Sequence, residues 1–424
     1  MRRPVLLILA AVLFGSFACS KDSTSGADGG STDAGPADAG TTDAGSTDAG
    51  QTDAGPSDAG DVDAGLADAG DQDAGDIDAD SIDAGPPNGT IRFLNVQNAV
   101  GITSDGSTAL LLTFTASDSL VFLYDTASGS LTQVTRTGDS NDPITGIAAN
   151  GGRLIGFHGT SPVQAGIWSA DAGWLDLGTG FDGGVGCDPD LSSGWGLSAD
   201  GSIAVGLDWN GCVTNAFRWS DASGTGVFTE LQHIGTGSER ASVISDDGNV
   251  TGGFASSDVA DRTPAIWYPD AGGFALDPTQ QVIGEVLTLS HDGRMAAGIW
   301  NGIGFMWTED GGVTQIPGLP NTGGLDDSTF ELSIAANNQL IFGNSGNAWD
   351  EGNYATVWTQ AGGLQKLQDI VAANRISIPN GYVLSNAVAA SADGSIVVGN
   401  SHDSQANPVP HVFILQMPVS AYGL

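Results

Sequence analysis

The sequence has 424 residues, of which 50 are Asp or Glu and 12 are Lys or Arg, so its formal net charge is −38. Residues 20–89 hold 17 Asp and one Lys, and residues 90–424 hold 33 acidic and 9 basic residues. Both regions repel polyanions, which excludes nucleic acid and anionic lipid surfaces as partners. Basic proteins, divalent cations and neutral polysaccharides are compatible with this charge.

The first 18 residues have the features of a signal peptide for export. Arg2 and Arg3 precede an apolar run at residues 5–14, which is too short to cross a bilayer as a helix, and small residues follow it. Cys19 comes directly after the expected cleavage point, as in bacterial lipoprotein signals, so we expect Cys19 to carry a lipid. Residues 16–18 (SFA) also suit ordinary signal peptidase, and plain secretion is therefore the alternative.

The next region is a low-complexity repeat. Residues 31–85 follow a five-residue cycle, xxDAG, with an Asp at every fifth position from Asp33 to Asp83. Ala is its main apolar residue and Gly closes nearly every cycle, so burial cannot offset the loss of chain entropy on folding. The sequence predicts that residues 19–89 form a lipid-anchored, disordered acidic tether, which precedes a folded domain at residues 90–424.

A longer repeat runs through the folded domain. The stretch SADGSIAVG at residues 198–206 returns as SADGSIVVG at residues 391–399. Related turns end at Gly106, Gly151, Gly248, Gly293 and, in a degenerate copy, Asn338. Asp-Gly or Asn-Gly between two β-rich runs predicts a hairpin turn, because Gly supplies the positive φ that a tight turn needs. We therefore interpret Asp200 and Asp393 as turn formers and not as catalytic or metal-binding residues.

Each turn is followed by a third strand with an aromatic anchor and then by a fourth strand. The anchors are Tyr124, Trp168, Trp219, Trp267, Trp307 and Trp358. Four short antiparallel strands repeated seven times predict an all-β fold, a seven-bladed β-propeller. The seventh unit ends without a fourth strand, so we expect the strand at residues 90–96 to complete the blade of residues 382–418. The alternative is a six-bladed ring in which the copy around Asn338 merges with its neighbour.

Most of residues 99–418 follow one pattern, A-x-x-x-S-x-D-G-x-x-x-x-G and then a strand of the Ala-Phe-x-Trp type. This pattern resembles a bacterial extracellular repeat family that is named for its His-Ala-Phe tripeptide. The tripeptide itself is degraded here to NAF at residues 215–217, IGF at residues 303–305 and HVF at residues 411–413. The resemblance implies an exported surface or envelope protein, and it implies no particular reaction.

The loops differ between the two faces expected of the ring. The SADG turns and the turns after the aromatic anchors are short, whereas the loops on the opposite face vary in length, as binding loops on rigid scaffolds do. Three long loops place Trp beside polar residues: Asp208, Trp209 and Asn210; Trp300 and Asn301; Asn347, Trp349 and Asp350. Such pairs suit a sugar ring or a protein hot spot. Packing of these rings over neighbouring blades is the alternative.

The cysteines and histidines limit the chemistry of the domain. With Cys19 acylated, Cys187 and Cys212 form an even pair in an oxidising setting, and we predict a disulfide between them. The five histidines are His158, His233, His291, His402 and His411, which fall in different units. The sequence contains no HExxH and no CxxC, so we expect no metal and no other cofactor.

These features together predict a monomeric, non-catalytic lipoprotein of the outer membrane, surface-exposed or periplasmic, or alternatively a secreted protein. Its long-loop face would bind a polysaccharide or an envelope protein, and only the lipid would contact the membrane. The sequence has no GxSxG and no P-loop. One alternative is a hydrolase or lyase acting on extracellular glycans, with Asp208, Asp350, Glu351 and His158 near the channel mouth. The other is a purely structural envelope protein.

Overall fold

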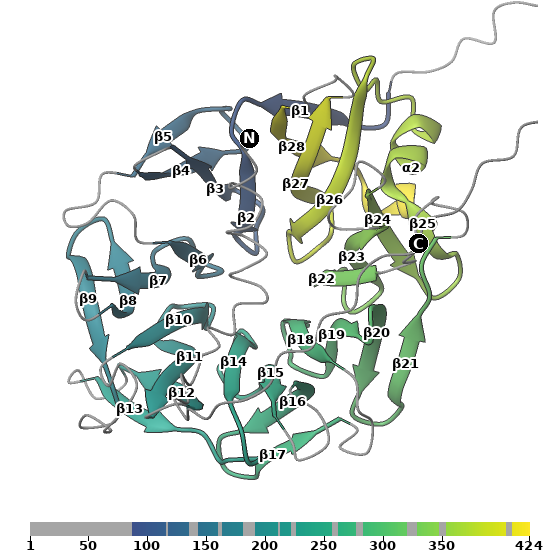
Figure 1. Cartoon of the computed structure of the whole chain (residues 1–424). Helices are drawn as coiled ribbons and strands as arrows, with labels where there is room; N and C mark the ends of the chain where they lie inside the picture. Colours follow the sequence, from purple (N-terminus) through teal and green to yellow (C-terminus); the bar gives the residue numbers. More distant parts are fainter. Residues whose placement is uncertain are drawn as a thin grey trace, which may run out of the picture. The chain divides into compact units, whose positions relative to one another are not determined.

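The folded domain is a ring of seven four-stranded antiparallel sheets, as the computed structural model shows (Figure 1). The structure describes residues 87–115, 118–134, 143–159, 163–180, 191–210, 213–221, 226–256, 262–276, 283–319, 329–346, 353–403 and 409–424. The seven-bladed β-propeller predicted from the repeat is confirmed. The predicted signal peptide, Cys19 and the acidic tether as far as residue 86 lie outside the described residues.

The blades follow one another in chain order, with the innermost strand of each blade first in the first six. Blade 1 contains β2 (Asn98–Ile102), β3 (Thr108–Phe114), β4 (Ser119–Asp125) and β5 (Leu131–Gln133). Blade 2 contains β6 (Ile144–Ile147), β7 (Leu154–His158), β8 (Gln164–Ser169) and β9 (Gly173–Gly178). Blade 3 contains β10 (Ser192–Leu197), β11 (Ile203–Asn210), β12 (Val213–Ser220) and β13 (Val227–Glu230). Blade 4 contains β14 (Glu239–Ile244), β15 (Thr251–Ala255), β16 (Thr263–Tyr268) and β17 (Gly272–Ala275).

The remaining blades repeat this arrangement. Blade 5 contains β18 (Gly284–Leu289), β19 (Met295–Trp300), β20 (Ile303–Thr308) and β21 (Gly312–Ile316). Blade 6 contains β22 (Thr329–Ala335), β23 (Leu340–Ser345), β24 (Tyr354–Thr359) and β25 (Gly363–Lys366). Blade 7 contains β26 (Tyr382–Ala390), β27 (Ile396–Asp403), β28 (Pro410–Gln416) and, as its outer strand, β1 (Thr90–Leu94).

The two ends of the domain close the ring within blade 7. Strand β1 pairs antiparallel with β28, in a register that runs from Thr90 opposite Gln416 to Leu94 opposite Val412. This pairing confirms the predicted use of the leftover strand. The copy around Asn338 forms the separate sheet of blade 6, so the six-bladed alternative is wrong. A closed ring leaves no open end of the blade array to pair with another chain.

The side chains of the repeated SxDG turn hold the turn together. In blade 3 the carboxylate of Asp200 accepts hydrogen bonds from the Ser198 hydroxyl (2.9 Å) and from the Ser202 amide (2.9 Å), and Gly201 has φ of 71°. The hydrogen bonds from Ser202 are the main cause that holds the pKa of Asp200 below its usual value. Asp393 makes the same bonds with Ser391 and Ser395, so both aspartates form turns, as expected.

The tips of these turns also connect neighbouring blades through their backbones. The bonds run from Ser104 N to Ala149 O, Asn150 N to Ala199 O, Ala199 N to Asp246 O, Asp246 N to His291 O, Ala336 N to Ala392 O and Ala392 N to Ser104 O, at 2.8 to 3.1 Å. Among the described residues no such backbone bond joins the tips of blades 5 and 6, which are linked instead through the side chains of Asn338 and Asp292. The turn repeat therefore serves to close this face of the ring.

The last glycine of the repeated stretch is required by a close backbone approach. A Cβ atom on Gly206 would collide with the carbonyl oxygen of Ser193, which a bulge in β10 directs toward β11. Gly156, Gly253, Gly298, Gly343 and Gly399 meet an inner-strand carbonyl in the same way. The spacing of Gly201 and Gly206 thus reflects one local geometry that most blades share.

Replacing Gly206 by Ala is expected to lower the free energy of unfolding by about 1–3 kcal/mol, because the backbone of β10 must shift to admit the methyl group. Urea denaturation followed by tryptophan fluorescence measures this change. Gly152→Ala is the control, since its Cβ would meet only the flexible side chain of Asn150, and we expect a change within about 0.5 kcal/mol. Equal stability of the two variants would contradict the close approach.

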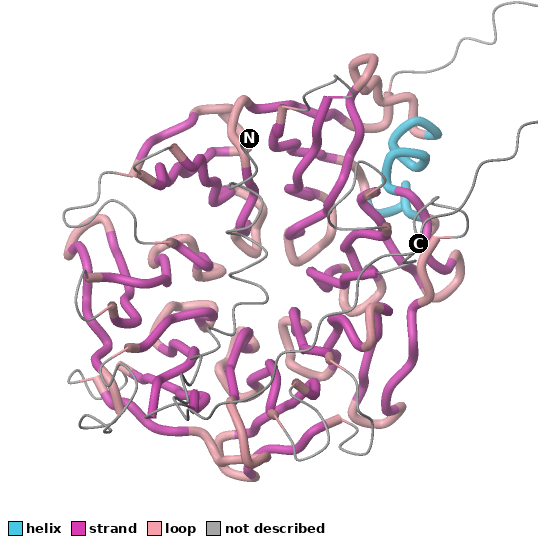
Figure 2. Tube along the Cα trace, viewed as in Figure 1, coloured by secondary structure: helices cyan, strands magenta, loops and turns pink. Residues whose placement is uncertain are grey.

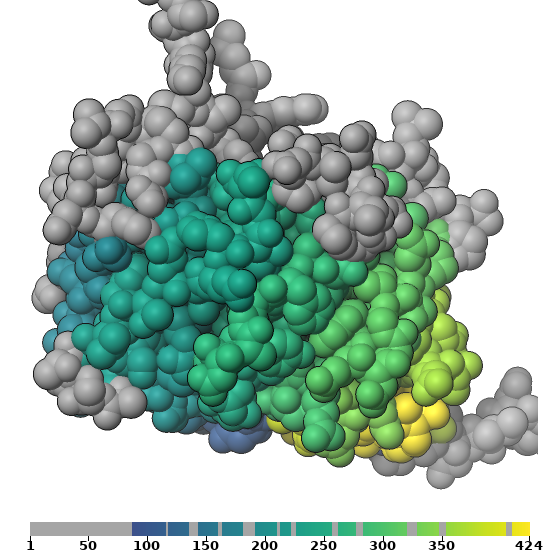
Figure 3. All heavy atoms as spheres, turned by 90° about the horizontal axis from the view of Figure 1, so that it is seen from below, coloured from purple at the N-terminus to yellow at the C-terminus, as the bar shows by residue number. Residues whose placement is uncertain are grey.

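Among the described residues, one short α-helix lies between the strands (Figure 2). Helix α2 (Leu367–Ala373) follows β25, and its Leu367, Ile370 and Val371 are buried in an apolar cluster with residues of blades 6 and 7. A 3₁₀ turn, η1 (Val419–Tyr422), adds Tyr422 to the same cluster. In the described part of the chain, no helix is long and apolar enough to span a membrane. On the side of the ring that Figure 3 shows, the described atoms from teal to green pack closely against one another.

Candidate functional site

Of the residues predicted for the binding face, those that the structure describes do not share one exposed surface. Trp300 is a correction: it ends β19, its side chain is only 7% exposed, and it packs with Phe305 and Val286 in the core between blades 4 and 5. Its ring therefore offers no surface to a ligand. Asn301 is exposed in the turn after β19, with φ of 54°. Asn347, Trp349, Asp350 and Glu351 lie outside the described residues, as do Cys187 and Cys212.

Asp208 and Trp209 lie on opposite faces of β11, because side chains alternate along a strand. Asp208 is fully buried and its carboxylate accepts a hydrogen bond from the Gly180 amide at 2.8 Å. Burial raises the pKa of Asp208 to about 6 even though this hydrogen bond acts in the opposite direction. Trp209 is partly exposed, and Asn210 ends the strand. The predicted pairing of Asp208 with the Trp209 ring is therefore wrong.

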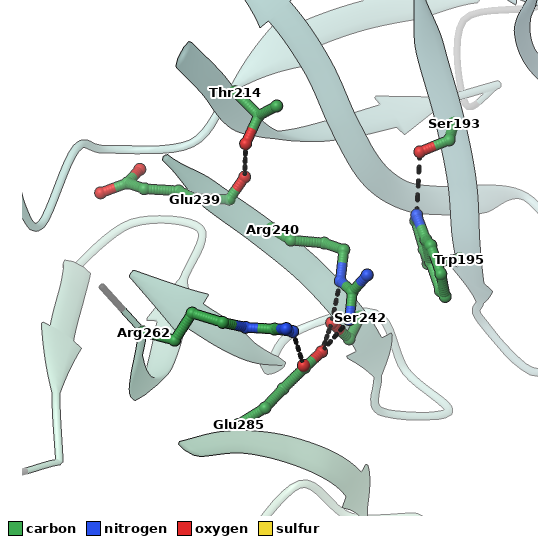
Figure 4. Close-up of polar contacts among 8 residues, drawn as sticks. All are labelled: Ser193, Trp195, Thr214, Glu239, Arg240, Ser242, Arg262 and Glu285. Atoms are coloured by element: carbon green, nitrogen blue, oxygen red, sulfur yellow. Dashed lines mark hydrogen bonds and ion pairs between the residues drawn. The ribbon is translucent and has the colours of Figure 1, made fainter. Parts of the chain in front are cut away.

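A buried charge network that the sequence analysis missed lies between blades 4 and 5 (Figure 4). Arg240 of β14 and Arg262, directly before β16, both bind the carboxylate of Glu285 in β18. The Arg240 Nη2 to Glu285 Oε1 distance is 2.6 Å, Arg240 Nε donates to Ser242 Oγ at 3.1 Å, and Ser242 Oγ donates to Glu285. All three charged side chains are at most 9% exposed. Such a network is expensive to bury unless its charges are paired.

Aromatic rings flank the two guanidinium groups. The Arg240 guanidinium carbon lies 4.0 Å from the centre of the Trp195 ring, and that of Arg262 lies 4.0 Å from the centre of the Phe254 ring. These are cation–π distances. Trp195 belongs to the inner strand β10, donates from Nε1 to Ser193 Oγ at 2.9 Å, and is partly exposed. The network thus carries an aromatic ring that solvent reaches in part.

The carboxylate at the centre of the network stays ionised. Burial alone would raise the pKa of Glu285, but the charges of Arg240 and Arg262 and the hydrogen bond from Ser242 outweigh it and leave the pKa below its ordinary value. The network uses two of the nine basic residues in the strongly acidic region 90–424.

A second carboxylate organises the connection between blades 3 and 4. Glu239 is fully buried at the start of β14 and accepts hydrogen bonds from the amides of Ile234 (2.7 Å) and Gly235 (3.0 Å). Its other oxygen lies 3.3 Å from Nδ1 of His233, whose Nε2 lies 2.5 Å from Glu230. Burial raises the pKa of Glu239 despite these contacts. Glu239 therefore fixes the path of this loop and the orientation of His233.

The buried charged groups gather at one end of the ring. Glu239, Arg240 and Glu285 lie at the starts of inner strands, Arg262 precedes a third strand, and Asp208 is near the end of a second strand. Because the strands are antiparallel, all of these positions are at the end opposite the SxDG turns, where the long loops begin. Perturbed ionisable groups cluster at functional sites more than elsewhere. No group of three or more His, Cys, Asp or Glu side chains within the described ranges could hold a metal ion.

The repeat contained a signal for the network. Arg240 and Glu285 occupy the same position of consecutive units, five residues before Ser245 and Ser290. The same position holds Asn98, Pro143, Ser193, Phe330 and Asn386 in the other units. A basic residue and an acidic residue at equivalent positions of adjacent blades indicate a contact across the interface between these blades.

His158, named in the enzyme alternative, forms a hydrogen bond with Asp176 in blade 2 and stacks on Trp174, so no described contact joins His158 to Asp208.

Comparison with known proteins gives no family. No family model and no curated protein matches the sequence. Among solved structures, TolB from Acinetobacter baumannii has 15% identity and a TM-score of 0.38 over 65% of this chain and 62% of that chain, which is less than two thirds of its length. The β-propeller domain of Myceliophteria thermophila Cps50 (Swd1) has 9% identity and a TM-score of 0.47 over 76% and 98%. Oligogalacturonate lyase from Vibrio parahaemolyticus has 13% identity and a TM-score of 0.48 over 78% and 92%. At these identities the similarity concerns the fold alone.

Proposed function

We propose that this propeller is a non-catalytic binding domain that takes a neutral extracellular polysaccharide at the end of the ring where the long loops begin. The observation that carries the proposal is the partly exposed Trp195 ring beside the Arg240–Glu285–Arg262 network. The C–H face of a sugar stacks on an aromatic ring, and its hydroxyls exchange hydrogen bonds with polar groups beside that ring, while the buried network holds the Trp195 ring in place. The negative charge of the domain disfavours polyanionic chains.

The geometry of the acids favours binding over catalysis. Glu285 is held by two guanidinium groups and a hydroxyl, so it neither gives nor takes a proton near neutral pH. Glu239 and Asp208 accept hydrogen bonds from backbone amides, which fix loop ends. A general acid or base must reach the substrate, and both of these carboxyl groups are fully buried. The SxDG end is a poor binding surface, since its turn groups already bond one another.

The test is binding of the full chain to an array of neutral polysaccharides, with the Trp195→Ala variant alongside. We expect at least about tenfold weaker binding for Trp195→Ala, because stacking on the ring is lost. Phe274→Ala is the matched control: this ring is 40% exposed on the outer strand β17, and its removal should leave binding unchanged.

Three outcomes would contradict the proposal. Equal binding by the Trp195→Ala and wild-type chains would remove Trp195 from the site. Capture of an envelope protein with no glycan bound would favour a protein partner. Cleavage of a bound glycan would favour the hydrolase or lyase alternative.

We also propose that the domain is held at the cell envelope by a lipid on Cys19, as the signal sequence predicts. The Cys19→Ala variant should move from the membrane fraction to the soluble fraction and lose labelling by a fatty acid, because the thiol that takes the lipid is absent. Ser23→Ala, four residues further along, should stay in the membrane fraction. Membrane-bound Cys19→Ala protein would show that another feature anchors the chain.

A further inference from the structure

Blade 6 carries an acid where every other blade carries an apolar residue or glycine. Glu331 in β22 lies four residues before Ala335, the position that matches Ser198 in the SxDG turn. The corresponding residues of the other blades are Ala99, Ile144, Gly194, Ala241, Val286 and Ala387. Glu331 is 0% exposed. The repeat itself therefore identifies Glu331 as a departure from the core pattern, and such departures in native proteins mark functional or strained sites.

The surroundings of Glu331 give its carboxyl group nothing to pair with. Neither carboxyl oxygen has a hydrogen-bond partner in the described part of the chain, and neither does the buried hydroxyl of Thr356. Glu331 and Thr356 are aligned across Gly343, on the face of blade 6 that packs on blade 5. On the blade 5 side, Gly304 lies close to this carboxyl group, since a Cβ on Gly304 would lie 2.8 Å from Glu331 Oε1.

The position of Thr356 is also exceptional within the repeat. Its counterparts in the other six blades are Phe122, Gly166, Phe217, Ala265, Phe305 and Phe413. None of them has a polar side chain, and Phe217, Phe305 and Phe413 are 0% exposed core residues. Blade 6 thus has a carboxyl and a hydroxyl group where the other blades have apolar side chains or glycine. Burying unpaired polar groups lowers the stability of the fold.

Among the described residues, no opposite charge lies on the strands that pack against β22. Strand β18 carries Glu285, another acid, which Arg240 and Arg262 hold, and the titratable group of β26 is Tyr382. Strands β19, β20, β21, β23 and β24 contain no Asp, Glu, His, Lys or Arg. The nearest titratable side chain on these strands is Tyr354 of β24, whose ring lies 3.7 Å from the Lys366 ammonium of β25. Burial raises the pKa of Glu331 to about 8, with no contribution from a neighbouring charge. The closed interface therefore holds Glu331 in its neutral form.

Two backbone features weaken the same interface. The tips of blades 5 and 6 lack, among the described residues, the backbone hydrogen bond that joins the other tips. The blade 6 turn also places three successive non-glycine residues, Ala336, Asn337 and Asn338, at φ of 52°, 53° and 69°. Such conformations are costly for residues with a Cβ and persist only where the surrounding structure holds them.

We propose that the interface between blades 5 and 6 is a pH-sensitive seam, at which the ring opens locally when Glu331 loses its proton. In the closed ring the carboxyl group is protonated, because a carboxylate there would have no partner. Opening exposes the group to water, where it ionises and releases one proton to solvent. Each opening event therefore releases a proton, and opening becomes more favourable as the pH rises.

Hydrogen exchange of the full chain, measured by mass spectrometry and corrected for the intrinsic exchange rate, tests this proposal. For the wild type, protection of β22–β24 should fall about tenfold for each pH unit between pH 5 and 7, since opening releases one proton. In Glu331→Gln this pH dependence should disappear. Glu331→Ala, which restores the residue of blades 1, 4 and 7, should behave like Glu331→Gln and covers the case in which the amide disturbs folding.

Glu239→Gln is the control, because Glu239 is equally buried but belongs to the interface of blades 3 and 4. It should keep the wild-type response in β22–β24. The proposal is overturned if Glu331→Gln and Glu331→Ala keep the wild-type pH dependence in β22–β24. It is also overturned if exchange in the wild type rises first at the pairing of β1 with β28.

Discussion

Replacement of Glu285 by Ala is expected to lower the free energy of unfolding by about 3–5 kcal/mol. The reason is that Arg240 and Arg262 would stay buried without the carboxylate that they share. The two positive charges also repel each other: besides burial, the charge of Arg240 lowers the pKa of Arg262. Urea denaturation at pH 7 measures the loss. Glu309→Ala is the control: this residue is exposed on the turn after β20, and its replacement should change the stability by about 0.5 kcal/mol or less.

A triple variant separates the role of the network in folding from the role in binding that we propose for it. Replacing Arg240 and Arg262 by Met and Glu285 by Leu removes all three charges at roughly conserved volume, and a buried ionic network replaced in this way often keeps or gains stability. We expect the triple variant to be more stable than Glu285→Ala and to lose polysaccharide binding. If Glu285→Ala is no less stable than Glu309→Ala, the network is not the coupled, buried unit that its distances indicate.

The fold could be predicted from the sequence because its determinants are local and repeated. Asp200 and Gly201 specify a hairpin turn without reference to the rest of the chain, and the same turn chemistry recurs at Asp393. Ring closure followed from one strand left over before the first unit and a fourth strand missing from the seventh unit, a place that β1 takes beside β28. Helix α2 was missed, since its apolar residues, Leu367, Ile370 and Val371, cover only two turns.

The site could not be predicted in the same way, because it depends on contacts between blades. Trp300 was placed in a loop, whereas β19 continues to this residue and its ring turns into the core. Asp208 and Trp209 are adjacent in sequence, but the alternation of a strand sends them to opposite faces. Arg240 and Glu285 are far apart in sequence, and only a comparison of equivalent repeat positions would have brought them together.

Replacement of Glu331 by Gln is expected to raise the free energy of unfolding by about 3 kcal/mol at pH 7 and by less than about 1 kcal/mol at pH 5. The folded-state pKa of Glu331, about 8, lies above the ordinary value of 4.5, so the folded wild type binds more protons than the unfolded chain between these values. The stability that Glu331 contributes when protonated is therefore fully present below pH 4.5 and is lost as the pH rises toward 8.

Glutamine does not titrate. The slope of the free energy of unfolding against pH in the Glu331→Gln variant should therefore differ from the wild-type slope by the contribution of one bound proton between pH 4.5 and 8. Urea denaturation at pH 5, 6, 7 and 8 measures both slopes. Glu309→Gln, an exposed exchange of the same chemical type, should leave the wild-type slope unchanged. If Glu331→Gln also keeps the wild-type slope, Glu331 is ionised in the folded chain and must have a partner. If the slope disappears, the buried Glu331 makes the ring less stable at neutral pH than it would be with alanine, the residue at this position in blades 1, 4 and 7.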